Sequence, residues 1–309
     1  MRHGFQLNLR RRTLLLGTRT LVMGILNVTP DSFSDGGRFR TPEAAVAHGL
    51  ALLDEGADIL DIGGESTRPG VATSGQSGAV TATEELDRIL PVLEALHRER
   101  PQAVLSVDTY KSEVARQAVA AGAEIVNDVS GFLWDPAMAA TLAQLPCAAI
   151  LMHTRGRPGE WRSQSAAQDI VALVKNELRQ RVEQAIAIGV RRHSLVLDPG
   201  FGFGKNRDEN YQLLARFAEF ESLRFPLLAA VSRKGFLGQT VAERLSLPHP
   251  VPPETRDAAT FAASVAAALA GAHIVRVHAV RPTVEALAVA DTILAAEGCP
   301  PAELPPAKS

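Results

Sequence analysis

The chain has 309 residues, of which 46% are hydrophobic and 21% charged, a composition typical of globular proteins. Its 32 Lys and Arg nearly balance its 34 Asp and Glu, so no overall field would draw the chain to nucleic acid or to an anionic membrane. The first apolar run, residues 14–16, is too short for a signal-peptide core or a membrane span, and Cys147 and Cys299 have no zinc-type spacing, so we expect a reduced, cytoplasmic setting.

The first 20 residues contain two short apolar segments around basic residues, FQLNL and TLLLGTRT. They predict a β-hairpin within residues 1–20, with an irregular arm as the alternative. After them come eight short runs rich in Val, Ile and Leu, at 21–28, 57–64, 104–109, 125–130, 148–153, 194–199, 226–232 and 274–279. Such runs are typical of strands in a parallel sheet that is buried on both faces.

Segments of helical period lie between these runs. In residues 41–57, Thr41 suits an N-cap, Pro42 suits the first turn, and Gly56 suits a C-terminal stop. Later helical segments end in the same way, at Gly122, Gly189 and Gly271.

Eight strands with intervening helices predict an α/β fold, a single (β/α)8 TIM barrel over residues 21–296. The hairpin would close the bottom of this barrel. The alternative is an open doubly wound sheet, but no G-x-G-x-x-G turn follows the first strand. Residues 297–309 are rich in Pro and lack an apolar stripe, which predicts a flexible tail.

All eight runs end in polar residues. The catalytic groups of barrel enzymes come from the carboxyl ends of several strands, so this pattern predicts a site at that end. A helix cap or a solvated turn would explain any one of these residues equally well. Polar residues at the ends of all eight runs are harder to explain in that way and favour a functional site. The polar residues, in chain order, are Asn27, Glu65, Asp108, Asn127 with Asp128, His153, Asp198, Arg233 with Lys234, and Arg276 with His278.

The cationic residues suit an anion. Arg276 and His278 are two residues apart on one strand, so both side chains lie on the same face of the strand and can bind one anion together. Lys234 and Arg68 add positive charge, as is needed where a phosphate or pyrophosphate leaves. For Arg68, a salt bridge in a surface loop is the alternative.

Asp108, Asn127 and Asp198 instead suit a nitrogen heterocycle. A buried carboxylate accepts two parallel N–H bonds, and Asn supplies both a donor and an acceptor. The alternative is that the carboxylates pair with Arg276 or Lys234 in a structural network. Asn27 offers a neutral oxygen that could complete a Mg²⁺ shell with phosphate oxygens and water.

Two glycine-bearing loops carry further expectations. GILNVTPDSFSDGGRF after the first strand is long enough for a mobile lid over the site. PGFGFGKN at 199–206 is not a P-loop, because Pro199 and Asn206 stand where Gly and Ser or Thr are needed. Phe203 within it fits an aromatic wall beside a flat ligand, or else an ordinary core Phe.

The motifs MGILNVTPDSFSDGG, DIGGESTRPG, VDTYK, NDVSG, LMHTRG, LDPGFGFGK, SRKG and RVH occur in this order between about Phe5 and Asp291. In them the chain closely resembles the dihydropteroate synthase family. The resemblance implies condensation of 6-hydroxymethyl-7,8-dihydropterin pyrophosphate with p-aminobenzoate, giving dihydropteroate and pyrophosphate. It also implies a homodimer formed through the later barrel helices.

The resemblance further implies roles for single residues. Met152 and Arg276 would flank the pterin ring, and Asn27 would bind Mg²⁺ on the pyrophosphate. The residues that hold the pterin would be Asp108, Asn127, Asp198 and Lys234. The residues that contact phosphate oxygens would be Thr67, Arg276 and His278. The p-aminobenzoate pocket would form from Thr67, Arg68, Pro69, Phe203, Lys234 and, in the first loop, Asp35.

The mechanism that the resemblance implies is dissociative, with C–O cleavage before the arylamine attacks. Mg²⁺, Arg276 and His278 would stabilise the leaving pyrophosphate, and Asp108 would stabilise the pterin cation. Lys234 and Asp35 complete the implied catalytic set. An arylamine is already neutral at pH 7 and needs no strong base, so we interpret His153 as structural.

Two features depart from the family pattern. Gly235 stands where members often carry Ser, although its backbone N–H could substitute, and the loop after Pro69 is long. Two alternative functions also remain: a pterin-binding methyltransferase module, and a catalytically silent pterin-binding paralogue. The lid sequence and the SRK motif argue against the first, and the intact set of polar residues argues against the second.

Overall fold

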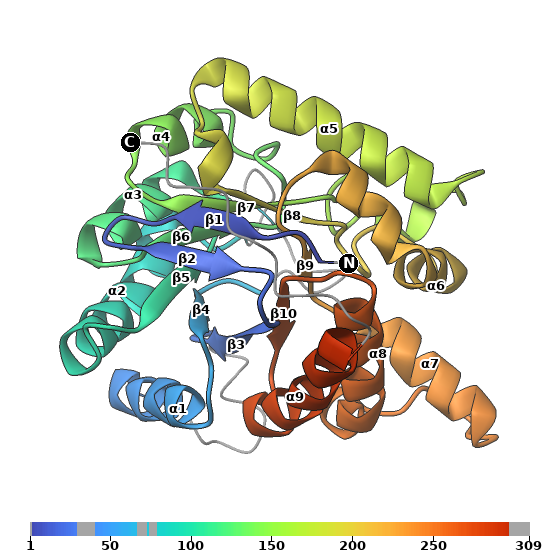
Figure 1. The fold of residues 1–309 in the computed structure, drawn as a ribbon. Coiled ribbons are helices and arrows are strands. Elements are labelled where there is room, and N and C mark those ends of the chain that lie inside the picture. Colours follow the sequence, from blue (N-terminus) through green and yellow to red (C-terminus); the bar gives the residue numbers. More distant parts are fainter. Residues whose placement is uncertain (1, 30–40, 67–72, 74–78, 297–309) are drawn as a thin grey trace.

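The computed structural model describes residues 2–29, 41–66, 73 and 79–296 (Figure 1). The lid expected after the first strand and the tail expected from residue 297 lie outside this part of the chain. Four residues expected in the site also lie outside it: Asp35, Thr67, Arg68 and Pro69.

Eight parallel strands form one sheet, in the order β8-β7-β6-β5-β4-β3-β10-β9. The Leu197 N–H of β8 donates to Pro226 O at 2.9 Å, and Leu197 forms a parallel bridge with Leu227, so β8 also meets the segment that leads into β9. The sheet therefore closes into the predicted barrel, and the open-sheet alternative is excluded. The strands are β3 (Leu21–Asn27), β4 (Ile59–Gly63), β5 (Val104–Asp108), β6 (Ile125–Asp128), β7 (Ala148–Met152), β8 (Leu195–Asp198), β9 (Leu228–Ala229) and β10 (Ile274–Val277).

Helices surround the barrel (Figure 1). Their local signals are those read from the sequence: the Thr41 side chain accepts the Ala44 N–H at 3.4 Å, and Gly122 and Gly189 follow helix ends with positive φ angles of 123° and 115°. The helices are α1 (Pro42–Asp54), α2 (Ala82–Glu99), α3 (Ser112–Ala121), α4 (Met138–Gln144), α5 (Ile170–Ile188), α6 (Arg207–Ala215), α7 (Gly235–Arg244), α8 (Asp257–Leu269) and α9 (Val280–Ala296). Within the described residues, no helix combines the length and apolarity needed to cross a membrane.

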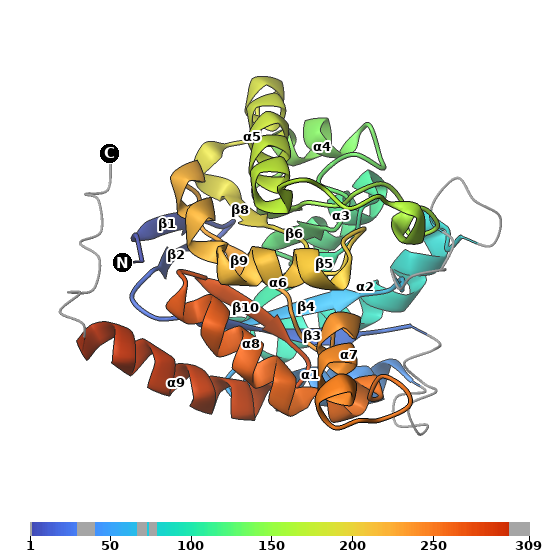
Figure 2. The same cartoon turned by 90° about the vertical axis from the view of Figure 1, so that its right-hand side faces the viewer.

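The N-terminal segment forms the predicted hairpin, with β1 (Phe5–Asn8) antiparallel to β2 (Thr13–Leu16). Leu7 and Leu16 are fully buried and pack into the same apolar cluster as the barrel-lining residues Met23 and Ile59. The hairpin therefore covers the amino-terminal end of the strands. In Figure 2 it lies at the left end of the barrel, away from the loop that leads into α7.

Side chains that point into the barrel change from apolar to polar along the strands. Ile59 belongs to the inner apolar cluster, and because alternate residues share a face, Asp61 and Gly63 follow it on the inner side of β4. The same step occurs from Ile125 to Asn127, from Val196 to Asp198 and from Ile274 to Arg276. The barrel is thus packed with aliphatic side chains at the hairpin end and lined with polar groups at the other end.

Candidate active site

The polar ends of neighbouring strands lie side by side. Asn27 of β3 pairs with Gly63 of β4, which pairs in turn with Asp108 of β5. Asp108 then pairs with Asn127 of β6. A Cβ added to Gly63 would lie 3.5 Å from Asp108 Cβ and 3.9 Å from Asn27 Oδ1, so the glycine leaves space between these two side chains. The strand register brings together residues that the sequence places a hundred positions apart.

Arg276 links two acidic side chains across this end of the barrel. Its Nε donates to Asp61 Oδ2 and its terminal nitrogen donates to Asp108 Oδ2, both at 2.6 Å. Asp61 Oδ2 also accepts from Asn127 Nδ2 at 2.9 Å, whereas Asp61 Oδ1 is buried without a partner among the described residues. Paired buried charges are expected, because an isolated one would be costly. The acids and Arg276 therefore form one connected network.

This pairing differs from the separation of acids and cations expected from the sequence: Asp108 pairs with Arg276, as the alternative allowed, whereas Asp198 accepts the Gly200 N–H. It also adds Asp61, which the sequence reading missed. Asp61 lies in the middle of an apolar run, and attention to the last residue of each run passes over it. The period of two from Ile59 was the signal that could have identified it.

Burial sets the ionisation of the network. Desolvation raises the pKa of Asp108 to about 7, with the nearby Asp61 adding to the rise and Arg276 opposing it. Burial alone would lower the pKa of Arg276, but Asp61 and Asp108 outweigh this effect and raise it. Arg276 thus stays charged, while Asp108 changes charge near neutral pH.

Asp198, Lys234 and Phe203 form a second group. Desolvation raises the pKa of Asp198 to about 6, against the Gly200 N–H that its Oδ1 accepts at 2.7 Å. Desolvation lowers the pKa of Lys234 to about 8, although Asp198 opposes that shift. Lys234 Nζ lies 4.1 Å from the centre of the Phe203 ring. A cation and a flat aromatic face are therefore combined beside a carboxylate.

The loop that carries Phe203 is built around a buried lysine, Lys205. Its Nζ donates to Gly200 O at 2.7 Å, Phe203 O at 3.1 Å and His153 O at 3.3 Å. A P-loop lysine would reach out to phosphate, whereas this lysine holds its own loop together, so the geometry agrees with the rejection of a P-loop. Sequence reasoning gave no signal for this role of Lys205.

The two histidines on strand ends face different surroundings. His278 Nδ1 lies 2.9 Å from Ser232 Oγ, which is two residues before Lys234, the N-cap of α7. His153 is fully buried, with Nε2 3.1 Å from Glu177 Oε2 of α5, and burial with the nearby Lys205 lowers its pKa to about 3. A neutral ring directed at a surrounding helix suits the structural interpretation of His153.

Another ion cluster, also missed from the sequence, braces the loops after β4 and β5. Lys111 Nζ donates to Glu65 and, at 2.5 Å, to Glu85 Oε2 of α2, and the Tyr110 hydroxyl donates to Glu65 Oε1 at 3.0 Å. Burial would lower the pKa of Lys111, but the two carboxylates raise it overall. Glu65, at the end of a predicted strand, therefore serves as a brace in this structure.

Aromatic side chains line the rim next to this cluster. Tyr110 and Trp134 meet edge to face with ring centres 5.1 Å apart, and Trp161 and Phe203 do so at 4.9 Å. Met152, expected to flank a ring, packs in the same buried cluster. Side chains from the segments that follow β5, β6, β7 and β8 thus form one apolar rim.

Asn27 is exposed at the end of β3 and keeps an oxygen available beside Asp108. The described residues contain no cluster of three or more His, Cys, Asp or Glu that could hold a metal ion. The Asn27 amide oxygen fits a Mg²⁺ ion that has phosphate oxygens among its other ligands and only one ligand from the protein. It does not fit a metal held by protein side chains alone.

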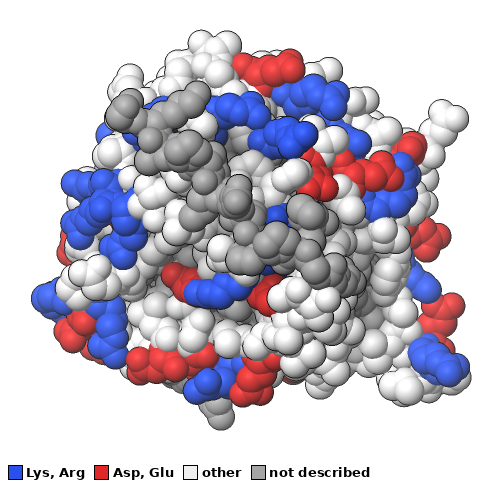
Figure 3. All heavy atoms as spheres, in the orientation of Figure 1, with Lys and Arg blue, Asp and Glu red and all other residues white. Residues whose placement is uncertain are grey.

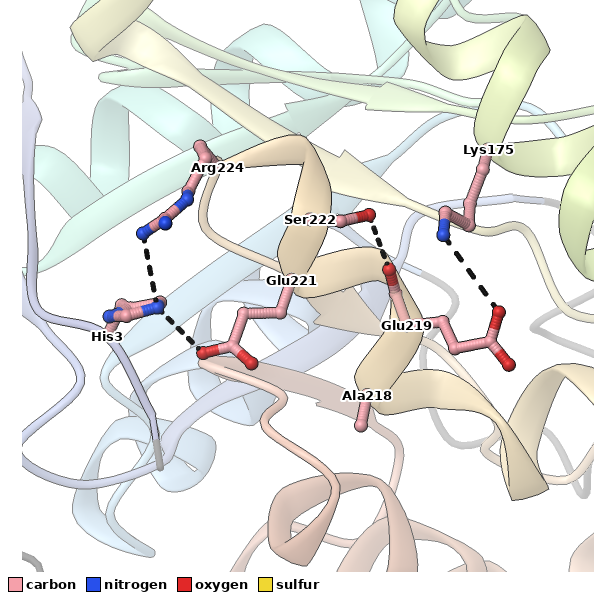
Figure 4. A pocket seen from close by; sticks show the side chains of 7 residues that line it. All are labelled: His3, Lys175, Ala218, Glu219, Glu221, Ser222 and Arg224. Atoms are coloured by element: carbon pink, nitrogen blue, oxygen red, sulfur yellow. Dashed lines mark hydrogen bonds and ion pairs between the residues drawn. The ribbon is translucent and has the colours of Figure 1, made fainter.

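A separate open depression lies elsewhere among the described residues. A cavity of about 410 Å³ near the hairpin is lined by residues that include His3, Lys175 and Arg224 (Figure 4). Its charged groups already pair with one another: His3 with Glu221 at 3.0 Å, and Lys175 with Glu219 at 3.9 Å. It also lies beside the segment that precedes β9, far from the polar strand ends. Figure 3, which faces this side of the molecule, shows acidic and basic side chains interspersed. We therefore place the candidate site at the polar end of the barrel.

Comparisons with known proteins identify the family of the chain. The family model described as "Pterin binding enzyme" matches residues 23–278. Dihydropteroate synthase of Escherichia coli K12 is 42% identical over 276 residues, covering 89% of this chain and 92% of that protein. The enzyme of Mycobacterium leprae is 45% identical over 276 residues, covering 87% and 91%.

Solved structures agree. Xanthomonas albilineans dihydropteroate synthase with 4-aminobenzoic acid has a TM-score of 0.83 and 45% identity, covering 96% of this chain and 100% of that one. The same enzyme in complex with 7,8-dihydropteroate has a TM-score of 0.75 and 39% identity, covering 93% and 96%. With a family model spanning most of its length and relatives this similar, the chain belongs to the dihydropteroate synthase family of pterin-binding enzymes.

Proposed function

We propose that this chain is a transferase that condenses 6-hydroxymethyl-7,8-dihydropterin pyrophosphate with p-aminobenzoate, forming dihydropteroate and pyrophosphate. The observation that carries the proposal is the polar end of the barrel. Acceptors for a heterocycle, a guanidinium for an anion and a lysine over an aromatic ring meet there within hydrogen-bonding networks. Relatives of similar sequence and length carry the name of this activity.

The pterin is bound by the inner carboxylates. Asp198 lies at the end of β8 with one oxygen on Gly200 N–H, which leaves its other oxygen for the ligand. The buried Asp61 Oδ1, without a described partner, is a second acceptor for ring N–H groups. Asn127, fixed by its hydrogen bond to Asp61, presents its amide oxygen. A flat ring with several N–H donors satisfies these acceptors together.

The pyrophosphate is bound by Arg276 and His278. Arg276 already holds Asp61 and Asp108 through two of its five N–H groups, and the remaining N–H groups can donate to phosphate oxygens. Asn27 would hold Mg²⁺ through its amide oxygen. When bound, the ion supplies positive charge to the leaving pyrophosphate.

Bond cleavage precedes bond formation in this mechanism. As the C–O bond breaks, the leaving pyrophosphate gains negative charge near Arg276, and the pterin methylene becomes cationic near Asp108. The amine of p-aminobenzoate then attacks the methylene carbon, and the resulting acidic ammonium passes its proton to water. A general base is not needed for the attack itself, because the arylamine is neutral at pH 7. The chain's main tasks are to position both substrates and to balance charge.

The p-aminobenzoate ring packs on Phe203, and its carboxylate meets Lys234. Gly235 is the first residue of α7, and a Cβ there would meet nothing within 4 Å. Backbone N–H groups at a helix start lack intrahelical partners and attract anions. The Gly235 N–H can therefore serve where family members often use a Ser side chain. Thr67, Arg68, Pro69 and Asp35 remain part of this proposal and lie outside the described residues.

A homodimer and a cytoplasmic location complete the proposal. Exposed apolar side chains on or next to α7, α8 and α9 offer a contact face: Leu245, Leu247, Leu269, Val289 and Ile293. Burial raises the pKa of the Cys147 thiol to about 12, so it stays protonated and unreactive, which suits a reducing compartment.

The direct test incubates the purified chain with the pterin pyrophosphate, p-aminobenzoate and Mg²⁺, and detects dihydropteroate by mass spectrometry. We expect product only when both substrates are present. Binding of the pterin without product would identify a silent paralogue instead. Absence of both binding and product would contradict the assignment of the site.

A further inference from the structure

We propose that Trp161 is a positioning residue for the p-aminobenzoate subsite, holding the Phe203 ring and, through it, the Lys234 ammonium. This inference rests on the proposed function, since p-aminobenzoate is the substrate proposed there. Trp161 belongs to none of the strand ends or motifs discussed so far. It lies in a short 3-10 turn, residues 161–163, between β7 and α5.

Contacts with Phe203 define what Trp161 can do. The two rings meet edge to face, with centres 4.9 Å apart and planes at 81°. Lys234 Nζ lies 4.1 Å from the centre of the same Phe203 ring. Phe203 is thus fixed by an indole and in turn supports a cation. A shift of the Trp161 indole would move both the Phe203 ring and the Lys234 ammonium, the two groups proposed to bind p-aminobenzoate.

The indole itself is held rigidly. Its Nε1 donates to Gly156 O at 3.2 Å, and both Trp161 and Phe203 are at most 8% exposed. Within the same turn, Arg157 N–H donates to Glu160 Oε2 at 2.7 Å, and Glu160 N–H donates to Arg157 O at 2.8 Å. This bracing makes Trp161 a fixed support and not a side chain that adapts to its neighbours.

The two loops also touch through their backbones. Arg155 N–H donates to Phe203 O at 3.4 Å, and a Cβ on Gly204 would lie 2.7 Å from atoms of Arg155. The loop after β7 therefore adjoins the loop after β8 along its length. Trp161 provides the side-chain part of this contact, the part that reaches Phe203.

The pterin subsite is not supported by Trp161 in the same way. Asp61, Asp108 and Asn127 lie on β4, β5 and β6 and are held by Arg276 and by one another. Asp198, the other proposed pterin acceptor, is held by the Gly200 N–H at 2.7 Å. Removing the indole should consequently affect the amine substrate more than the pterin. A merely structural role would weaken both subsites alike.

The test compares Trp161→Leu with the wild-type enzyme. We expect the KM for p-aminobenzoate to rise by about 2- to 12-fold, the range that loss of an aromatic pair produces. The dissociation constant of the pterin pyrophosphate, measured by calorimetry, and kcat should stay within about twofold of wild type. Trp161→Phe keeps an aromatic ring and should recover most of the affinity for p-aminobenzoate.

Trp134→Leu is the matched control. Trp134 is the other tryptophan of the chain and lies on the same rim, but it packs on Tyr110 and not on Phe203. It should leave the KM for p-aminobenzoate near the wild-type value. If Trp161→Leu does not fold, Trp161→Met takes its place in the same comparison.

If the wild-type enzyme forms dihydropteroate, three results would overturn the role of Trp161 alone. These are an unchanged KM for p-aminobenzoate in Trp161→Leu, a rise of that KM in Trp134→Leu equal to the rise in Trp161→Leu, or a loss of pterin affinity in Trp161→Leu equal to its loss of p-aminobenzoate affinity. A wild-type chain that forms no dihydropteroate would overturn the proposed function and this assignment with it. The wild-type assay therefore separates the two failures.

Discussion

Replacing Arg276 by Met tests whether the ion pairs at the polar end of the barrel are as strongly coupled as their burial implies. The guanidinium donates two hydrogen bonds of 2.6 Å, to Asp61 and to Asp108, and Asp61 is fully buried. Removing one partner of a buried ion pair leaves uncompensated charge, at a cost of about 3–5 kcal/mol. We expect the free energy of unfolding at about pH 8 to fall by that amount.

Asp108 gives this loss a pH dependence. Burial raises its pKa to about 7 even beside Arg276, from an ordinary value of 3.8, and removing the guanidinium raises it further. A carboxyl whose pKa is higher in the folded state binds its proton more tightly there. Its protonation therefore stabilises the fold at low pH, and this stabilisation is lost as pH rises through the folded-state pKa. The cost of Arg276→Met should be smaller at about pH 5.5 than at about pH 8.

Urea unfolding of the wild type and of Arg276→Met at the two pH values measures this difference directly. The double variant Asp108→Asn/Arg276→Met is the control, because a neutral amide removes the titrating group. It should regain part of the stability lost at the higher pH, and measured against Asp108→Asn alone, the cost of Arg276→Met should no longer differ between the two pH values through Asp108. An equal cost at both pH values, or a larger cost in acid, would refute the reasoning.

Three further predictions concern activity. Asp198→Asn should weaken pterin binding by about 1–3 kcal/mol in calorimetry, because a charge-assisted contact is lost; unchanged affinity would contradict its role. Lys234 has a pKa lowered to about 8, so turnover should decline as pH rises through that value and the ammonium loses its proton, and Lys234→Arg should move the decline to higher pH. Chelation of Mg²⁺ should slow steady-state turnover, and Asn27→Ala should raise the Mg²⁺ concentration needed for half-maximal rate; rates insensitive to both changes would disprove the metal assignment.

The fold was predictable because its signals are local. A Thr cap, glycines after helices and short runs of branched residues determine where elements begin and end. The structure differs mostly at boundaries. The last strand but one was expected at 226–232, but its regular part covers only Leu228–Ala229, and Leu227 forms an isolated bridge with Leu197. Pro226 at its start has no N–H to donate to a ladder, so the regular pairing begins later.

The site was predictable in its membership but less so in its connections. Strand-end residues could be found from the sequence because the carboxyl ends of parallel strands meet at one end of a barrel. Which side chains pair could not, because Arg276 lies 168 residues from Asp108 and 215 from Asp61, and only closure of the barrel brings them together. Trp161 gave no local signal because it acts on a neighbouring loop, and Lys205 gave none because its bonds to backbone oxygens of its own loop and to His153 O follow from the folded geometry and not from a motif.

The pairing of Arg276 with Asp61 and Asp108 changes how the site has to be understood. Had the acids and cations been separate, each substrate group would meet its own part of the protein, and the two binding events would be independent. Here one guanidinium neutralises both acids and also lies where the pyrophosphate is proposed to bind. An anion that draws Arg276 toward itself weakens its interaction with Asp108 and so makes that carboxylate a stronger proton acceptor. The charge on the leaving group and the charge beside the pterin are therefore coupled through a single side chain.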